Sequence, residues 1–324
     1  MFPERRMRRL RKRSLQPLFT ENRLDVHDLV MPVFFDETAE NPVPIPSMPG
    51  QYRYPVSMAG AVARDIRRDG LEAVILFGIP KKKDAAASGA AAADGVIQQA
   101  VRAMKGAEPG LVVMTDVCAC EYTDHGHCGI VGDTPCGPDL LNDPSLDLMA
   151  AIAVSHAECG ADIVAPSCML DGMVGAIRHA LDAAGHADIP IMSYSSKFCS
   201  GLYGPFRDAA DSGFSFGDRS TYQIAPANGR EAMRESMLDE QEGADILMVK
   251  PASWYLDIIA NVKTLGMPVA AYQVSGEYAM IKAAAGQGWL QEKTVVLESA
   301  TCIKRAGADL IITYFARDIA RWLR

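Results

Sequence analysis

The stretch REAMRESMLDEQEGADILMVKP, residues 230–251, contains the unit from which the fold is built. Its first part reads as a helix and runs to Gly243, and glycine is the residue type that commonly ends helices. Its second part, DILMVKP, is a short apolar run without the alternation of a half-exposed strand. Such a run is typical of a parallel strand buried on both faces. The stretch therefore predicts a helix that leads into a buried parallel strand.

The same unit recurs along the chain. A helical stretch precedes each later strand, and several of these stretches end in glycine. Eight strands, each reached through a helix, indicate an α/β fold with a single (β/α)8 TIM barrel. We assign residues 29–324 to the barrel and residues 1–28 to an extended N-terminal arm. The expected strands are LVMPVFF (29–35), AVILFGIP (73–80), LVVMTDV (111–117), DIVAPS (162–167), IPIMSYSS (189–196), DILMVKP (245–251), PVAAYQVS (268–275) and DLIITYFA (309–316).

The amino-acid composition indicates a protein with a large core and reduced cysteines. Of the 324 residues 49% are apolar and 22% are charged, which permits a large core. No apolar run approaches the roughly 18–20 residues that span a bilayer, and the basic N-terminus lacks the apolar segment of a secretory signal. Eight cysteines without an export signal indicate reduced thiols rather than a disulfide scaffold. We therefore expect a cytoplasmic protein that does not bind a membrane.

The charge is distributed unevenly. Residues 1–13 carry seven Lys/Arg and one Glu, a net charge of +6, so that a total of −8 leaves −14 for the remainder. A basic arm on an acidic body can grip nucleic acid, or it can lie on a neighbouring acidic subunit. The charge pattern is only weak support for a nucleic-acid partner. We therefore interpret the arm as an oligomerisation segment.

Two connections stand out. The alanine-rich run DAAASGAAAADG (84–95) is expected to be a mobile loop. The segment CSGLYGPFRDAADSGFSFGDRSTYQ (199–223) is longer than a typical loop of an α/β unit. Its glycines, aromatic residues and two arginines predict a lid over the mouth of the barrel.

Reactive residues gather where the strands end, which is where barrels of this kind carry their chemistry. Lys197 and Lys250 end the fifth and sixth strands, which are neighbours in a barrel. Burial and a second ammonium nearby both lower the pKa of a lysine, and a neutral amine forms Schiff bases with ketones. A single strand-end lysine usually reaches solvent, but two on adjacent strands favour catalysis. The strand-end set is Phe77, Asp116, Cys118, Cys120, Ser167, Cys168, Lys197, Lys250, Tyr272, Ser275 and Tyr314.

Three cysteines and two histidines lie in DVCACEYTDHGHCG, residues 116–129. Cys118, Cys120 and Cys128 supply three thiolates, and either His125 or His127 would complete a closed structural zinc site. An open site would instead leave the fourth position to water or substrate. Because these thiolates lie at the barrel mouth, we favour an open zinc site that holds a substrate amine or carbonyl. A redox pair would leave the third cysteine without a role. The other cysteines, Cys136, Cys159, Cys168, Cys199 and Cys302, are interpreted as small core residues.

Anion-binding groups complete the predicted site. Arg207 and Arg219 on the lid can clamp a carboxylate with paired donors. Ser275 and Tyr314 end the last two strands and offer a second, hydroxyl-lined pocket. Two lysines and two anion pockets indicate that two keto-acid molecules bind side by side.

At these residues the sequence resembles the δ-aminolaevulinate dehydratase (porphobilinogen synthase) family. The resemblance covers nearly the whole chain, and long motifs in the right order make it specific. It is carried by LVMPVFF, SMPGQYRYPV, VILFGIP, DVCACEYTDHGHCG, SYSSKFCSGLYGPFRDA, LMVKPA, AYQVSGEYAMI and TYFA. The family condenses two molecules of δ-aminolaevulinate into the pyrrole porphobilinogen, an early step toward haem and other tetrapyrroles.

The resemblance implies a role for each matching residue. Lys250 would hold the substrate that supplies the propionyl side, and Lys197 the one that supplies the acetyl side. Zinc would bind Cys118, Cys120 and Cys128. The remaining implied residues are Asp116 and Ser167 lining the pocket, Arg207, Arg219 and Gln223 on one carboxylate, Ser275 and Tyr314 on the other, Phe77 and Tyr272 in contact with substrate, and Glu235 as an allosteric magnesium ligand.

The resemblance also implies a homo-octamer in which the basic arm embraces a neighbouring subunit. Two departures from the family pattern are the alanine-rich loop and the cysteines at positions 168 and 199, which would allow additional thiol ligation. The alternatives are a Schiff-base aldolase, which leaves the three cysteines unexplained, and a zinc-stabilised nucleic-acid-binding protein that uses the arm.

Overall fold

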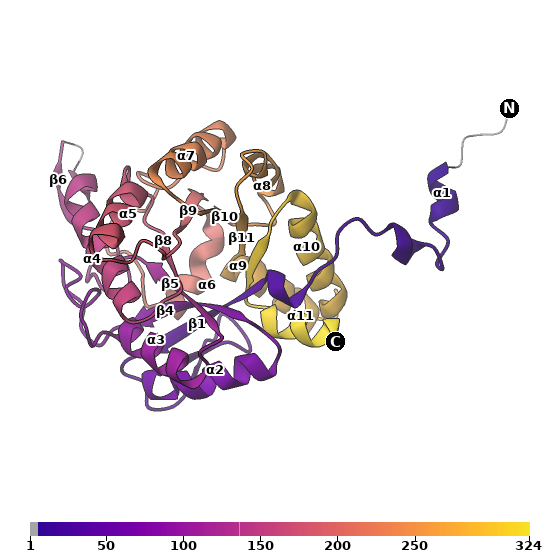
Figure 1. The fold of residues 1–324 in the computed structure, drawn as a ribbon, viewed down its shortest axis with the longest axis horizontal. Helices are drawn as coiled ribbons and strands as arrows, with labels where there is room; N and C mark the ends of the chain where they lie inside the picture. Colours follow the sequence, from indigo (N-terminus) through magenta and orange to yellow (C-terminus); the bar gives the residue numbers. More distant parts are fainter. Residues whose placement is uncertain (1–5, 136) are drawn as a thin grey trace.

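The computed structural model describes residues 6–135 and 137–324. Within them, eight parallel strands form a ring in the order β8–β5–β4–β1–β12–β11–β10–β9 (Figure 1). An isolated parallel bridge between Val164 and Ile191 joins the two ends and closes the barrel. The prediction of a single (β/α)8 barrel is confirmed. The strands are β1 (Leu29–Asp36), β4 (Ala73–Ile79), β5 (Val112–Val117), β8 (Ile163–Pro166), β9 (Met192–Lys197), β10 (Ile246–Lys250), β11 (Val269–Gln273) and β12 (Leu310–Thr313).

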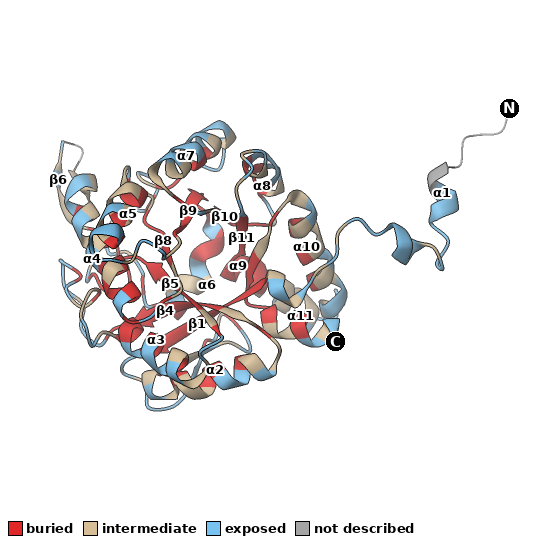
Figure 2. Ribbon diagram, in the orientation of Figure 1, coloured by how far each residue is buried: buried red, intermediate tan, exposed pale blue. Residues whose placement is uncertain are grey.

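The strands form the core, and the helices cover it with one face each (Figure 2). All eight residues of β1 are buried, as expected for a strand without alternation. In α2, the buried residues Ala59, Val62, Ala63 and Ile66 recur at the spacing of one helix face. The helices between strands are α2 (Ala59–Arg68), α3 (Val96–Ala107), α4 (Asn142–Glu158), α5 (Met173–Ala183), α7 (Gly229–Glu242), α8 (Leu256–Lys263), α9 (Ser275–Gly286) and α10 (Glu292–Ala306).

The unit quoted above folds as predicted. Helix α7 ends at Gly243, whose φ of +105° is a left-handed conformation that glycine adopts without steric cost. The polar strand β9 is nevertheless buried because its serines bond to this helix. Ser193 donates to Asp239 at 2.6 Å, and Ser196 donates to the carbonyl oxygen of Ala232 at 3.0 Å.

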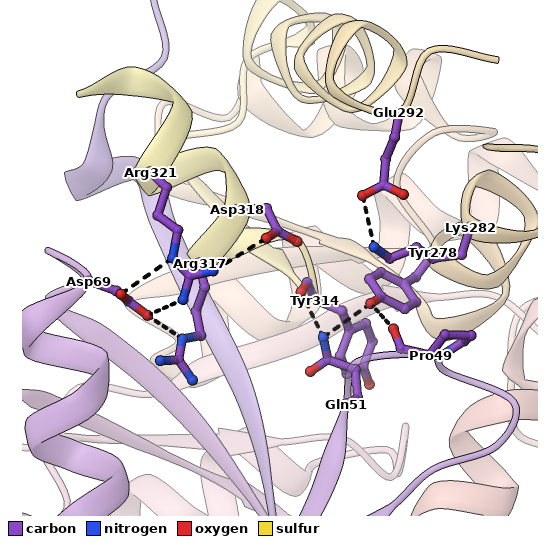
Figure 3. A network of polar contacts seen from close by, with 10 residues as sticks. All are labelled: Pro49, Gln51, Asp69, Tyr278, Lys282, Glu292, Tyr314, Arg317, Asp318 and Arg321. Carbon is purple, nitrogen blue, oxygen red and sulfur yellow. Dashed lines mark hydrogen bonds and ion pairs between the residues drawn. The ribbon is translucent and has the colours of Figure 1, made fainter. Parts of the chain in front are cut away.

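Some elements were not expected from the sequence. They are the hairpins β2 (Val43–Pro44) with β3 (Tyr52–Pro55) and β6 (Val131–Thr134) with β7 (Gly137–Leu140), the short lid helix α6 (Gly204–Ala209), and the C-terminal helix α11 (Ala316–Leu323). Helix α11 is held to the rest of the barrel by ion pairs of Arg317 and Arg321 with Asp69 (Figure 3).

The alanine-rich connection differs from its prediction. Residues 84–95 were expected to be a mobile loop, but they form a series of hydrogen-bonded turns. The carboxylate of Asp84 accepts from the backbone N–H groups of Ala86 and Ser88, both at 3.0 Å. Ala87 and Ala90 are fully buried. Small side chains allow Ala87 and Ala90 to pack closely, whereas Ala85, Ala86 and Ala93 are exposed.

The N-terminal segment extends away from the barrel (Figure 1). It contains α1 (Arg6–Leu10) and two short 3₁₀ turns, Gln16–Phe19 and Val26–Asp28. Its base is fixed where Lys304 forms an ion pair with Asp28 at 2.7 Å. Part of the predicted basic stretch, residues 1–5, lies outside the described residues, as does Cys136. No helix in the described part of the chain is both long and apolar enough to cross a membrane.

Candidate active site

The two lysines lie side by side at the strand ends. Lys197 is the last residue of β9, Lys250 is the last of β10, and the two are paired in register. Both side chains are only 5% exposed. Lys197 donates to the carbonyl oxygen of Ser167 at 2.5 Å, and the ammonium of Lys250 lies 4.2 Å from the centre of the Tyr272 ring. The prediction that the lysines end adjacent strands is confirmed.

The electrostatic environments of the two lysines differ. Burial, and then the charge of Lys197, lowers the pKa of Lys250 to about 7. Burial also disfavours the charge on Lys197, but the thiolates of Cys128 and Cys118 outweigh it and raise the pKa of Lys197. The expectation that each lysine keeps the other neutral therefore holds for Lys250 and is wrong for Lys197, because three cysteine sulfurs raise the pKa of Lys197, whereas burial and the charge of Lys197 are the leading influences on Lys250.

A buried carboxyl group lies beside the lysines. Asp116 on β5 accepts a hydrogen bond from the hydroxyl of Ser167 at 3.1 Å. Burial raises the pKa of Asp116, and the positive charges of Lys197 and Lys250 oppose this rise. A carboxyl group with a raised pKa next to two amines can carry a proton between reacting atoms.

The three predicted cysteines come together in the structure. The sulfur atoms of Cys118, Cys120 and Cys128 all lie within 4.8 Å of one another, and all three residues are buried. Three thiolates at this spacing fit zinc, because soft sulfur ligands favour it over hard cations. The cluster therefore suits a thiophilic ion.

Of the two histidines of this stretch, only His127 has both ring nitrogens in contact with other groups. The ring of His127 contacts the carbonyl oxygen of Phe216 and the hydroxyl of Tyr222, each at 3.1 Å. His125 Nδ1 accepts from the backbone N–H of His127 at 3.1 Å. Within residues 6–135 and 137–324, the three-cysteine group includes no histidine. Neither histidine is a ligand of this group as it stands, and His125 Nε2 is buried without a hydrogen-bond partner among the described residues.

Two further residues join this region. Cys168, which the sequence placed at a strand end but assigned to the core, has its sulfur 3.4 Å from that of Cys118. Glu121 is buried, and burial followed by the charge of Asp116 raises its pKa to about 7. The sequence signal for Glu121 was its position directly after Cys120. Of the other described cysteines, Cys159 is buried, as predicted, whereas Cys199 and Cys302 are partly exposed.

The predicted lid carries buried polar groups without partners. Arg219 is 4% exposed and donates through Nη2 to the carbonyl oxygens of Gly126 and Ser212 at 2.8 and 3.1 Å, while its Nε has no partner. Both polar atoms of the Gln223 side chain and the Nε of Arg207 also lack partners. Buried polar groups are normally hydrogen-bonded, so these atoms are suited to an anion that completes them.

The second predicted anion pocket is partly occupied by protein groups. The Ser275 hydroxyl accepts from the backbone N–H of Phe206 at 2.9 Å and lies 3.3 Å from the carbonyl oxygen of Leu202. The hydroxyls of Tyr314 and Tyr272 are 3.1 Å apart. Phe77 is buried, with its ring 5.1 Å from that of Phe206 on the lid helix.

A polar network supports this side of the barrel (Figure 3). Gln51 donates to the carbonyl oxygen of Tyr314 at 3.1 Å. The hydroxyl of Tyr278 donates to the carbonyl oxygen of Pro49 at 2.6 Å. These bonds tie the end of β12 and helix α9 to the segment before β3.

Glu235 lies apart from the lysines and thiols, on helix α7. It lines a cavity of about 410 Å³ together with Glu231, Asp171, Asn142 and Asn228. Burial raises the pKa of Glu235, and the charges of Asp171, Asp239, Glu231 and Glu242 add to the effect. Carboxylate and amide oxygens gathered in this way suit a hard cation such as magnesium.

A closed (β/α)8 barrel with buried amines, thiols and a carboxyl at its strand ends defines a barrel enzyme. A model of the family described as delta-aminolevulinic acid dehydratase matches residues 4–322. The chain belongs to this family, which confirms the resemblance read from its motifs.

Individual relatives match over nearly their full length. The delta-aminolevulinic acid dehydratase of Archaeoglobus fulgidus is 55% identical over 324 residues, which cover 100% of this chain and 99% of that protein. That of Halalkalibacterium halodurans is 52% identical and covers 98% and 97%. A similar solved structure is that of the Toxoplasma gondii delta-aminolevulinic acid dehydratase (porphobilinogen synthase), a crystal structure in complex with the reaction product porphobilinogen. It has a TM-score of 0.94 and 41% sequence identity, and the match covers 99% of this chain and 91% of that one.

Proposed function

We propose that this enzyme is a porphobilinogen synthase that joins its substrates through Schiff bases on Lys250 and Lys197. Two molecules of δ-aminolaevulinate give one porphobilinogen and two molecules of water. Family membership supports the reaction. The observation that carries the mechanism is the pair of buried lysines in register at neighbouring strand ends.

The chemistry begins with a neutral amine. The pKa of Lys250, lowered to about 7, leaves a large share of free amine at neutral pH. Its nitrogen adds to the ketone carbon of the substrate that supplies the propionyl side, and the carbonyl oxygen leaves as water. Lys197 does the same with the substrate that supplies the acetyl side, after its ammonium has passed a proton to the Asp116 carboxylate. Asp116 is positioned to take part in these proton transfers, and Ser167 holds its carboxyl group in place.

The three-cysteine cluster would hold zinc. When bound, zinc supplies a Lewis acid that holds the amine or carbonyl of one substrate. The chain's own contribution is to keep the thiols together in a buried place at the mouth. Reduced thiols at this position also support a cytoplasmic location.

The carboxylates of the two substrate molecules would bind to two separate sets of residues. The unpaired groups of Arg207, Arg219 and Gln223 support one carboxylate site on the lid. Ser275 and Tyr314 would bind the other, for which Ser275 must exchange a backbone partner. Phe77 and Tyr272 would wall the cavity between the pockets.

Assembly and allosteric control form the outer part of the proposal. Glu235 would bind a magnesium ion away from the chemistry, in the acidic cavity beside α7. The basic arm would embrace a neighbouring subunit in a homo-octamer. Its extension away from the barrel supports this role, since the described arm residues make few contacts with their own barrel.

Borohydride trapping tests the mechanism. Reduction in the presence of δ-aminolaevulinate should fix covalent adducts on Lys197 and Lys250, which peptide mass spectrometry locates. Lys250→Ala should lose pyrrole formation by on the order of 10⁴-fold or more, because an essential nucleophile is gone. Lys197→Ala should be severely impaired yet still trap one substrate at Lys250.

The exposed Lys293 serves as the matched control, and Lys293→Ala should retain both activity and trapping. An adduct confined to Lys250 would reduce Lys197 to an electrostatic role. Adducts on neither lysine would overturn the mechanism, and imine formation without a pyrrole product would favour an aldolase instead.

A further inference from the structure

A fourth thiol lies against the three-cysteine cluster. Cys168 follows β8, and Cys118 follows the neighbouring strand β5. The backbone N–H of Ser167 donates to the carbonyl oxygen of Val117 at 3.1 Å, so the pairing of these strands continues to their ends. This pairing brings the sulfur of Cys168 to 3.4 Å from that of Cys118, and Cys168 is fully buried.

The distances from the Cys118 sulfur to its two neighbouring sulfurs are close to those in a metal site. Zinc–sulfur bonds of about 2.3 Å in a tetrahedron place neighbouring sulfurs about 3.8 Å apart. Cys118 lies 3.3 Å from the sulfur of Cys120 and 3.4 Å from that of Cys168. Cys168 is therefore about as close to Cys118 as Cys120 is, although its sulfur does not belong to the group of three that lie within 4.8 Å of one another. Cys168 also interacts with the thiol of Cys128.

The surroundings of Cys168 leave its sulfur free for this role. Its other close contacts are weak ones, to the sulfur of Met149 at 3.3 Å and the carbonyl oxygen of Val117 at 3.8 Å. A fourth thiolate would bring the zinc site to a formal charge of −2. Lys197 and Arg219 interact electrostatically with the cysteine sulfurs and can offset this charge.

We propose that Cys168 is a fourth thiolate ligand, which closes the zinc site in the enzyme without substrate. The inference rests on the proposed zinc site, and it adds a residue that the three-cysteine pattern lacks. A four-sulfur ion has no open position, so a substrate atom can reach the metal only by replacing one sulfur. Cys168 is the ligand that a substrate would replace, because it follows β8, whereas the other three cysteines all follow β5.

Metal spectroscopy of the full-length enzyme tests this inference. Under reducing, anaerobic conditions, X-ray absorption of the zinc-loaded protein should give four sulfur neighbours, and Cys168→Ser should give three. Cobalt substitution should show the same change as a weaker thiolate-to-metal absorption band. Chelator competition should show that Cys168→Ser binds zinc at least about tenfold more weakly. Loss of a residue that only hydrogen-bonds to a metal ligand already lowers metal affinity by about that factor. Cys159→Ser, a buried cysteine at the end of α4, should match the wild type.

Three sulfurs in the wild type, with unchanged affinity in Cys168→Ser, would overturn the inference and leave Cys168 as a core residue. Thermal melting of the metal-free variants shows whether they fold, and Cys168→Ala supplies a second variant without a hydroxyl. Failure of the proposed zinc site would give a different result from failure of the Cys168 inference. In that case both the wild type and Cys120→Ser would bind zinc weakly.

Discussion

At the scale of single residues, the surroundings of Lys250 determine its chemistry. An exposed lysine is protonated at neutral pH and cannot attack a ketone. Here the side chain is buried among aromatic rings, with the Tyr272 ring centre at 4.2 Å and that of Tyr194 at 4.9 Å. Aromatic faces stabilise the ammonium in part. Burial together with the Lys197 charge nevertheless prevails and lowers the pKa of Lys250 to about 7.

The pH dependence of imine formation follows from this shift. Because the pKa is lowered, the amine is protonated below about pH 7 and neutral above it. The rate of substrate trapping at Lys250 should therefore rise as pH increases through about 7 and level off above. In Lys197→Met the midpoint should move to higher pH, since a positive charge that lowers the pKa is removed. Single-turnover borohydride trapping across a pH series measures both midpoints.

Lys293→Met should leave the midpoint of the wild type in place, because this exposed residue lies away from the site. A midpoint for Lys197→Met equal to or below that of the wild type would show that Lys197 does not act on Lys250 through its charge.

At the scale of elements, the lid is docked on the cysteine-bearing loop. Ser215 donates from its backbone to the carbonyl oxygen of His125 at 3.0 Å, and Arg219 donates to that of Gly126. Gly126 has φ of +72°, and an added Cβ would collide with the backbone of Gly213 on the lid. The loop that positions Cys128 and the lid that carries the arginines are therefore one packed unit.

Gly126→Ala should loosen this unit. The left-handed backbone and the collision should cost about 1–3 kcal/mol of stability. They should also raise KM for δ-aminolaevulinate more than they lower kcat, since Arg207 and Arg219 lose their position. Steady-state kinetics and limited proteolysis of residues 204–223 report the two effects.

Gly106→Ala is the matched control. Gly106 lies in helix α3, and an added Cβ there meets no atom within 4 Å. This variant should be neutral or slightly stabilised, because alanine favours helix over glycine. Unchanged KM and protease resistance in Gly126→Ala would show that the lid does not depend on this contact.

At the scale of the whole molecule, the three cysteines are a small part of a large buried core. This core comes from the eight strands and the inner faces of the helices (Figure 2). The cysteines lie at one end of this core, beyond the last residues of the strands.

Zinc removal should therefore abolish activity but preserve the fold. After chelation, pyrrole formation should fall to background while circular dichroism stays unchanged and Tm drops only by the amount expected for loss of a bound ligand. Adding zinc back should restore activity, and magnesium alone should not. Loss of the fold together with activity would make the site structural.

Removal of the arm should change the assembly. Deleting residues 1–13 should yield smaller species in light scattering, because the arm lies away from its own barrel (Figure 1). The barrel of the truncated chain should keep its circular dichroism spectrum. An oligomer of unchanged size would exclude residues 1–13 from the subunit interface.

The sequence alone determined the barrel and most of the candidate site. Runs buried on both faces, and helices that end in glycine, are local properties that can be read from a few neighbouring residues. Once the strands were assigned, their ends placed Lys197 beside Lys250 and Asp116 beside Ser167, because parallel strands in a barrel end on the same face.

Only the tertiary structure decided how these residues act on one another. The thiolates that raise the pKa of Lys197 come from another part of the chain, so the sequence predicted the wrong direction for that residue. Ser275 proved to be bonded to the lid, and the alanine-rich loop proved to be packed. Cys168 and Cys118 are separated by 50 residues, yet their sulfurs lie 3.4 Å apart. Such distances depend on strand register and side-chain packing, which no local pattern in the sequence records.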